Sequence, residues 1–198
     1  RQMCIRDRNK IINSYIEESK KALDTFLEID KLSILNASKL IVKAFKSGNK
    51  VLMSGNGGSA SDAQHFAAEL IGRFKRNRSS FAAISLNTDT SALTAIANDY
   101  DFTNVFSRQV EGLGKKGDIL LAISTSGNSK NIIKAAIQAK KQKLHIISLT
   151  GFNASVLEKN SDLCIKVPSK VTSHIQELHI IVVHLLCTLI EKQFFEKR

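Results

Sequence analysis

Cysteine and proline are scarce in this sequence, and long apolar runs are missing. Three cysteines, Cys4, Cys164 and Cys187, are too few and too scattered for a disulfide framework or a zinc finger. Cys164 and Cys187 lie within apolar segments, where a reduced and buried thiol is expected. No uninterrupted apolar stretch reaches the roughly 18 residues of a membrane span, and the longest, 180–186, contains His184. We therefore expect a reduced, cytoplasmic, globular protein with no membrane partner.

The length and charge point to one folded domain with an excess of positive charge. The 198 residues are 43% apolar and 24% charged, which excludes a disordered or fibrous chain. The net charge is +11, but no aromatic residues interleave with the basic clusters as a nucleic-acid stacking platform requires. Both clusters follow helical patterns and are interpreted as solvated basic helix ends, so we expect no nucleic-acid partner. The clusters comprise Arg73, Lys75, Arg76 and Arg78, and Lys140, Lys141 and Lys143.

The first eight residues differ from the rest of the chain. The segment RQMCIRDR lacks the periodicity that begins at Asn9, and no apolar region of a signal peptide follows it. It resembles a translated cloning or sequencing adapter. We therefore expect a single domain over residues 9–198.

Apolar spacing predicts two N-terminal helices, then alternating strands and helices, and a long final helix. The strand segments are continuous apolar runs, which are typical of parallel strands buried on both faces. The pattern predicts an α/β fold: a three-layer α-β-α sandwich with a five-stranded parallel sheet, flanked by N-terminal and C-terminal helices. The predicted helices cover residues 12–27, 34–45, 61–74, 90–97, 102–113, 131–141 and 172–195, and the predicted strands 51–53, 81–85, 118–124, 144–149 and 163–167.

A glycine-rich loop follows the first predicted strand, in the sequence GNGGS. Parallel sheets bind ligands beyond the carboxyl ends of their strands, and free amides at a helix start attract anions. One alternative is a tight turn in which Ser59 caps the next helix. Another is a dinucleotide fold, because Gly55, Gly57 and Ala60 fit its loose fingerprint. That fingerprint expects an acidic residue at the end of the second strand, and the nearest one, Asp89, lies beyond it.

A second loop, STSGNS at residues 124–129, follows the most apolar predicted strand. Its four hydroxyls and its run of amides stand at the start of the next helix. Hydroxyls donate to phosphate oxygens, and a helix N-terminus adds partial positive charge. The loop therefore predicts a phosphate site that needs no lysine.

These two loops together resemble the SIS-domain family, and more narrowly its phosphoheptose isomerases. The stretches GNGGSASDAQHFAAEL, LTAIANDYDF, ISTSGNS and HIQELHIIVVH carry the resemblance, which runs from about Asn9 to Phe195. It implies the SIS fold and an aldose–ketose isomerase acting on sedoheptulose 7-phosphate. It also implies a homotetramer with sites between subunits. The two N-terminal helices and the last helix carry more apolar surface than one small sheet can cover.

Two predicted helices carry the residues for chemistry. His65 and Glu69 are four residues apart and share one face. On the last helix, His184 is about 80° from Gln176 and His179 about 60° the other way, so spacing leaves the choice of histidine open. The resemblance favours His184 and leaves His179 a structural or supporting role. It implies a zinc ion, one per subunit, held by His65, Glu69, Gln176 and His184. Ordinary hydrogen-bonded side chains are the alternative.

Isomerisation needs a base that removes a proton beside a carbonyl and an acid that returns it to the neighbouring carbon. Groups that titrate near neutrality suit both steps; histidine does so already, and burial would move a glutamate towards that range. We expect Glu69 and His184 to be the acid–base pair, in either order. The expected substrate ligands are Asn56, Gly57, Gly58, Glu69, Asn98, Asp99 and Gln176 for the sugar, and Ser124, Thr125, Ser126 and Ser129 for the phosphate.

Two other functions are compatible with parts of the sequence. A non-catalytic relative binds the bacterial replication initiator, and this chain shares the stretches AQHFAA and LNTDTSALTAIAND with it. That relative would not need Glu69 and His184, both of which are present here. A sugar-phosphate-sensing regulator would add a DNA-binding domain, for which no residues are left over.

Overall fold

A computed structural model of the chain describes residues 5–29 and 31–196. Its centre is a five-stranded parallel sheet with the strand order β2-β1-β3-β4-β5. The predicted number of strands and their parallel direction are confirmed. The strands are β1 (Val51–Ser54), β2 (Ala83–Ser85), β3 (Ile119–Ser124), β4 (His145–Thr150) and β5 (Leu163–Lys166).

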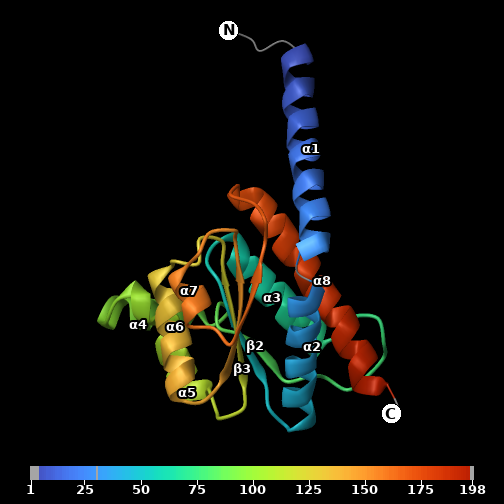
Figure 1. Cartoon of the computed structure of the whole chain (residues 1–198). Coiled ribbons are helices and arrows are strands. Elements are labelled where there is room, and N and C mark those ends of the chain that lie inside the picture. The colour runs from blue at the N-terminus through green and yellow to red at the C-terminus, as the bar shows by residue number, and fades with distance from the viewer. Residues whose placement is uncertain (1–4, 30, 197–198) are drawn as a thin grey trace.

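Helices cover both faces of the sheet and give the expected three layers (Figure 1). Successive strand residues point to opposite faces. Met53 and Leu121 therefore join the core beneath one helical layer, and Leu52 and Leu120 join the core beneath the other. The first layer holds α2 (Lys31–Lys46), α3 (Gly58–Ile71) and α8 (Thr172–Phe195); the second holds α4 (Thr90–Asp99), α5 (Val105–Leu113), α6 (Lys130–Lys141) and α7 (Val156–Lys159).

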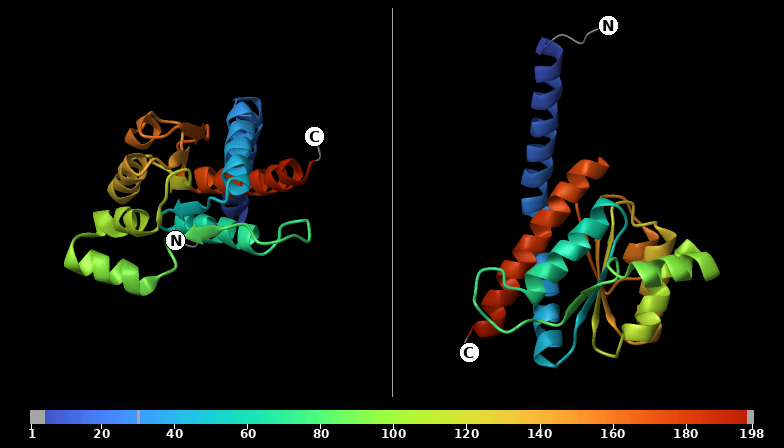
Figure 2. Two further views of the ribbon diagram at one scale, coloured as in Figure 1. Left: turned by 90° about the horizontal axis from the view of Figure 1, so that it is seen from below. Right: turned by 180° about the vertical axis from the view of Figure 1, so that it is seen from behind.

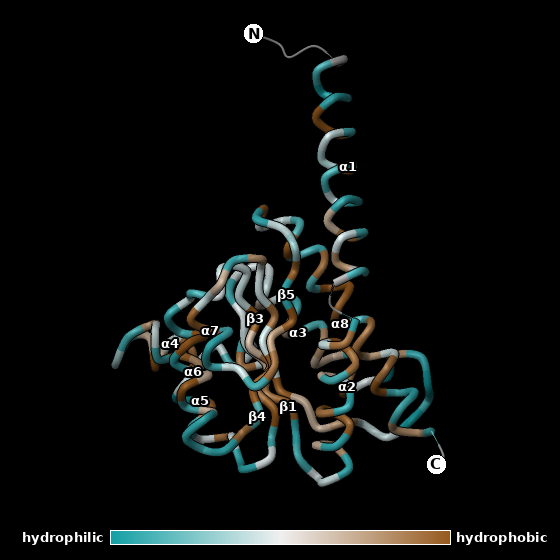
Figure 3. Tube along the Cα trace, viewed as in Figure 1, coloured by the Kyte–Doolittle hydropathy of each residue, from teal (hydrophilic) through white to brown (hydrophobic). Residues whose placement is uncertain are grey.

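The N-terminal helix α1 (Ile5–Ile29) extends away from the rest of the protein (Figure 2). Its C-terminal part reaches the core through Ala22 and Phe26. Apolar and polar segments alternate along the rest of it (Figure 3). Ile11, Ile12 and Ile16 are each about half exposed. The helix begins before the expected periodic segment, and residues 1–4 lie outside the described part of the chain.

By length and composition alone, α8 could cross a membrane, with a mean hydropathy of 1.5 over its most apolar window. The lack of a long uninterrupted apolar run therefore does not by itself exclude a helix that could span a membrane. In the structure this helix packs against α2 and α3, and 44% of that window is buried inside the protein. Its apolar composition is accounted for by its place in the first helical layer.

Three local predictions need correction. Helix α3 begins at Gly58 instead of residue 61 and ends at Ile71, where Gly72 follows. Residues 102–113 are not one helix, because a 3-10 turn (Phe102–Asn104) precedes α5. The short α7 was not predicted, although Ser155 and Glu158 form a capping box at its start.

Candidate active site

The two predicted ligand loops lie side by side at the carboxyl edge of the sheet. Adjacent strands β1 and β3 carry them, and the strand order reverses between these two strands, which is where open α/β sheets bind ligands. A reciprocal pair of amides joins the loops. Asn56 Nδ2 donates to Asn131 Oδ1 at 2.9 Å, and Asn131 Nδ2 donates to Asn56 Oδ1 at 2.8 Å. The structure thus makes one site of two sequence-distant loops.

The glycine loop needs glycine at two positions for different reasons. Gly57 has a φ of +55°, which side chains rarely adopt. Gly58 faces the carboxamide of Gln176, and a Cβ there would stand 2.7 Å from its Oε1 and Nε2. The predicted ligand Gln176 therefore packs on the start of α3, beside the loop. Ser59 is buried inside the helix and does not cap it.

The hydroxyl loop is organised before any ligand binds. Ser124 is buried and its Oγ donates to Ser129 Oγ at 3.1 Å, while Ser126 Oγ accepts from the Asn128 N–H at 3.2 Å. Thr125 and Ser126 line a cavity of about 180 Å³. Lys170 also lines that cavity, and no sequence pattern had singled it out. The cavity suits a small anion and has a cation at its wall.

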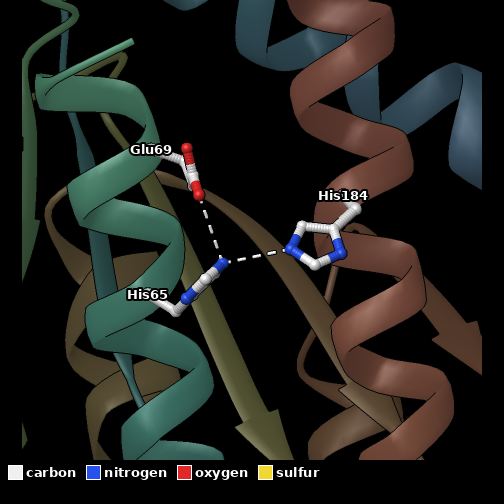
Figure 4. Close-up of side chains that lie close together, drawn as sticks. All are labelled: His65, Glu69 and His184. Atoms are coloured by element: carbon white, nitrogen blue, oxygen red, sulfur yellow. Dashed lines mark hydrogen bonds and ion pairs between the residues drawn. The ribbon is translucent and has the colours of Figure 1, made fainter. Parts of the chain in front are cut away.

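Three predicted metal or acid–base side chains meet between α3 and α8 (Figure 4). His65 Nε2 lies 3.0 Å from His184 Nε2 and 3.3 Å from Glu69 Oε1. Two imidazole nitrogens at this distance need a proton or a cation between them. The ligand atoms of the three residues all lie within 4.8 Å of one another. Ligands of a tetrahedral zinc ion, with bonds of about 2.0–2.1 Å, stand roughly 3.3 Å apart, so this arrangement fits zinc.

Gln176 is not part of that cluster within one chain. Helices α3 and α8 run in the same direction, with Gln176 beside Gly58 and His184 beside His65. Because a helix rises about 1.5 Å per residue, the eight positions between Gln176 and His184 correspond to about 12 Å. The structure therefore places Gln176 with the loops, and only three of the four expected zinc ligands come together. The expected burial of Glu69 is also incomplete, since 24% of its side chain is exposed.

Asn98 and Asp99 lie away from the other predicted ligands in the single chain. They are exposed at the end of α4, where Asn98 Nδ2 donates to Asp99 Oδ1 at 2.9 Å. Helix α4 belongs to the layer opposite α3 and α8 (Figure 1). The spacing of the sequence could not reveal this separation, because it depends on the direction in which α4 leaves the sheet.

Two titratable groups on the helices that carry the cluster have pKa values far from their ordinary range. Burial raises the pKa of Asp62 to about 6, although nearby His65 lowers it in part. Asp62 lies one turn before His65 on α3 and was missed by sequence reasoning. Burial also lowers the pKa of His179 to about 4, and its Nε2 faces the Thr150 carbonyl at 3.4 Å. His179 is fully buried and neutral, which makes it a structural residue.

The family follows from comparisons with known proteins. A family model described as the SIS domain matches residues 14–151. A phosphoheptose isomerase of Helicobacter pylori strain P12 is 51% identical over 181 residues, which cover 91% of this chain and 92% of that protein. This chain belongs to the phosphoheptose isomerases of the SIS-domain family. The phosphoheptose isomerase 2 of Campylobacter jejuni is 46% identical over 191 residues, which cover 96% of this chain and 95% of that protein.

Solved structures agree with this assignment. A phosphoheptose isomerase from Francisella tularensis superposes with a TM-score of 0.91 at 38% identity, covering 96% of this chain and all of that one. The phosphoheptose isomerase GmhA from Neisseria gonorrhoeae gives a TM-score of 0.88 at 41% identity, covering 93% and 98%. The predicted SIS fold is confirmed.

Proposed function

We propose that this SIS-domain protein is an aldose–ketose isomerase that converts sedoheptulose 7-phosphate to D-glycero-D-manno-heptose 7-phosphate. The observation that carries the proposal is the cluster of His65, Glu69 and His184 in a chain about half identical to phosphoheptose isomerases. The protein would act in the cytoplasm, at the first step towards activated heptose for lipopolysaccharide or capsule.

The hydroxyl loop and the glycine loop bind the substrate in this proposal. Thr125 and Ser126 donate to the phosphate from the wall of the 180 Å³ cavity, and Ser124 orients the hydroxyl of Ser129. The N-terminus of α6 adds partial positive charge at the same place. Asn56, Gly57, Gly58 and Gln176 surround the sugar beside the loop.

Glu69 and His184 move the protons. One of them removes a proton from C1 of the ketose, and the electron pair forms the C1–C2 double bond while the π pair of the C2 carbonyl moves to O2, which takes up a proton to give the ene-diol. A proton is then delivered to C2 as the O1 hydroxyl loses its proton and C1 becomes the aldehyde carbon. Each of the two side chains has a second polar atom besides the one that faces His65. Each can therefore bind a neighbouring group with one atom and exchange a proton with the other.

His65, Glu69 and His184 would also hold zinc, which would polarise the carbonyl oxygen during proton transfer. A pair of imidazoles and a carboxylate is a suitable ligand set for this metal. Gln176 would be a fourth ligand only if a second subunit brings its carboxamide to the cluster, because about 12 Å of helix separates it from His184.

A homotetramer accounts for two features of the single chain. The apolar residues of α1 are exposed along a helix that stands away from the protein, and a groove between α1, α2 and α8 is lined by Phe26, Ile34, Leu185 and Leu189. Asn98 and Asp99 are exposed at the end of α4, in the layer opposite α3 and α8. Packing of subunits through the helices would cover the apolar surface and could supply the missing ligands.

The comparisons do not support the alternative of a non-catalytic protein that binds the replication initiator. The test is to incubate the protein with sedoheptulose 7-phosphate and follow the aldoheptose phosphate by NMR. Glu69→Gln and His184→Asn should each lower the rate by about 10²–10⁴ while the protein stays folded. His145→Asn, an exposed histidine at the start of β4, is the matched control. A parent protein that converts no ketoheptose phosphate but binds the initiator would contradict the proposal.

A further inference from the structure

The segment between α3 and β2 contains a basic residue that is not solvated. The side chain of Arg78 is only 1% exposed, which corrects its interpretation as part of a solvated helix end. Its Nε donates to Glu191 Oε1 at 3.0 Å, and the Glu191 side chain is 4% exposed. An ion pair this deeply buried is costly to desolvate, and an apolar pair of similar volume is often at least as stable. A role beyond stability is therefore worth seeking.

Arg78 holds the end of the helix that carries Glu69. Its Nη2 donates to the Glu69 carbonyl at 2.9 Å and its Nη1 to the Leu70 carbonyl at 2.8 Å. The last carbonyls of a helix have no partner within the helix, so the guanidinium acts as a cap for α3. A third carbonyl, that of Ser79, accepts from Nη1 at 3.2 Å. Four of the five N–H donors of Arg78 are thus used inside the protein, and the side chain is almost fully buried, which leaves it unsuited to bind the phosphate of a substrate.

Glu191, on α8, binds the backbone of the segment that follows α3. It accepts the backbone N–H groups of Phe74, Lys75 and Arg76 at 3.0–3.2 Å, in addition to Arg78. Burial on its own would raise the pKa of Glu191, but these donors hold it below its ordinary value. Glu191 is therefore an ionised anchor on α8 for the segment that leaves α3.

Glu191 lies on the same helix as His184. Glu191 is seven residues, about two turns, after His184 and lies on the same face of α8. The ring of Phe74, whose N–H Glu191 accepts, stacks on the imidazole of His184 with centroids 5.7 Å apart and an interplanar angle of 19°. The ion pair is thus connected to Glu69 by the hydrogen bond from Arg78 to the Glu69 carbonyl. It is connected to His184 by the ring of Phe74, which stacks on the imidazole.

We propose that Arg78 and Glu191 are positioning residues that set the register of α3 against α8 and thereby hold Glu69 and His184 at their working separation. The proposal rests on the isomerase function proposed above. It assigns neither residue a contact with the substrate. It predicts that the pair controls turnover and metal affinity, with little influence on phosphate binding.

The test compares Glu191→Gln and Arg78→Lys with the parent. Glutamine keeps the size of Glu191 but loses the charge, and lysine cannot bond to the carboxylate and both carbonyls together. Both variants should lower kcat by about tenfold or more while KM for sedoheptulose 7-phosphate changes less than about threefold. Zinc affinity of the initially metal-free protein, measured by competition with a chelating dye, should fall by about 10–100-fold.

The matched control is Asp118→Asn. Asp118 also forms a poorly exposed ion pair, with Lys50, and accepts backbone N–H groups. Its partners Lys50 and Lys115 lie in the segments that precede β1 and β3, and not on α3 or α8. It should lower the melting temperature without changing kcat or zinc affinity. The proposal is overturned if folded Glu191→Gln keeps both kcat and zinc affinity within twofold of the parent, or if KM alone changes. An inactive parent would contradict the isomerase function, and the zinc titration would still decide the positioning role.

Discussion

The amide pair between Asn56 and Asn131 gives the sharpest prediction about substrate binding. Asn131→Ala removes both reciprocal hydrogen bonds and also the bond from the Ile132 N–H to Asn131 Oδ1. A side-chain hydrogen bond contributes about 1 kcal/mol net, and Asn56 is only half-buried, so water can replace part of what it loses. We therefore expect the free energy of unfolding to fall by about 1–2 kcal/mol. For a chain of this length that corresponds to roughly 2–8 °C in melting temperature.

The same change should weaken substrate binding. Without the pair, the glycine loop and the hydroxyl loop must be brought together when the phosphosugar binds, at a cost of the same 1–2 kcal/mol, or about 5–30-fold in Kd. Calorimetric titration of sedoheptulose 7-phosphate into Glu69→Gln protein, with and without Asn131→Ala, measures this while turnover is blocked.

Asn160→Ala is the control, because the side chain of Asn160, at the C-terminal end of α7, donates to the carbonyl of Val156 in the same helix and not to either ligand loop. In the same Glu69→Gln background, this change should leave Kd for sedoheptulose 7-phosphate within about twofold of its value without the change. If Asn131→Ala lowers the melting temperature as expected but leaves Kd unchanged, the pair does not set the spacing of the two loops. That result would refute the reasoning.

Four other predictions follow from the structure. Burial lowers the pKa of His179 from 6.5 to about 4 in the folded protein, so the stability that this group contributes above pH 6.5 is lost as the pH falls towards 4. Between these two pH values the unfolding free energy of the parent should drop by up to about 3 kcal/mol relative to that of His179→Leu, as measured by denaturant titrations. Ser126→Ala removes an exposed donor to a dianion and should raise Kd for the phosphosugar about tenfold or more, whereas unchanged affinity would place the phosphate elsewhere. Elemental analysis should find about one zinc per chain, and full activity of rigorously metal-free protein would exclude a role for zinc in turnover. Light scattering should give a tetramer, and a monodisperse 22 kDa species would contradict it.

The sequence by itself determined the layers and the loops. Continuous apolar strands separated by amphipathic helices favour a parallel sheet covered on both faces, because each apolar face must be buried. The loops GNGGS and STSGNS were identifiable because glycine lets the backbone approach a ligand closely, and hydroxyls and free amides at a helix start bind anions. The pairing of His65 with Glu69 also followed from helical spacing alone.

The order of the strands and the partners of each helix were decided only by the tertiary structure. The period of α8 could not say which histidine meets His65, since it gives angles around one helix and no direction towards another. Packing resolves this: His179 points to Thr150 in the sheet, and His184 points to α3. The burial of Arg78 was hidden for the same reason, because its partner Glu191 lies 113 positions away. A sequence pattern shows which residues share a face, but the neighbour that this face meets depends on how distant elements pack.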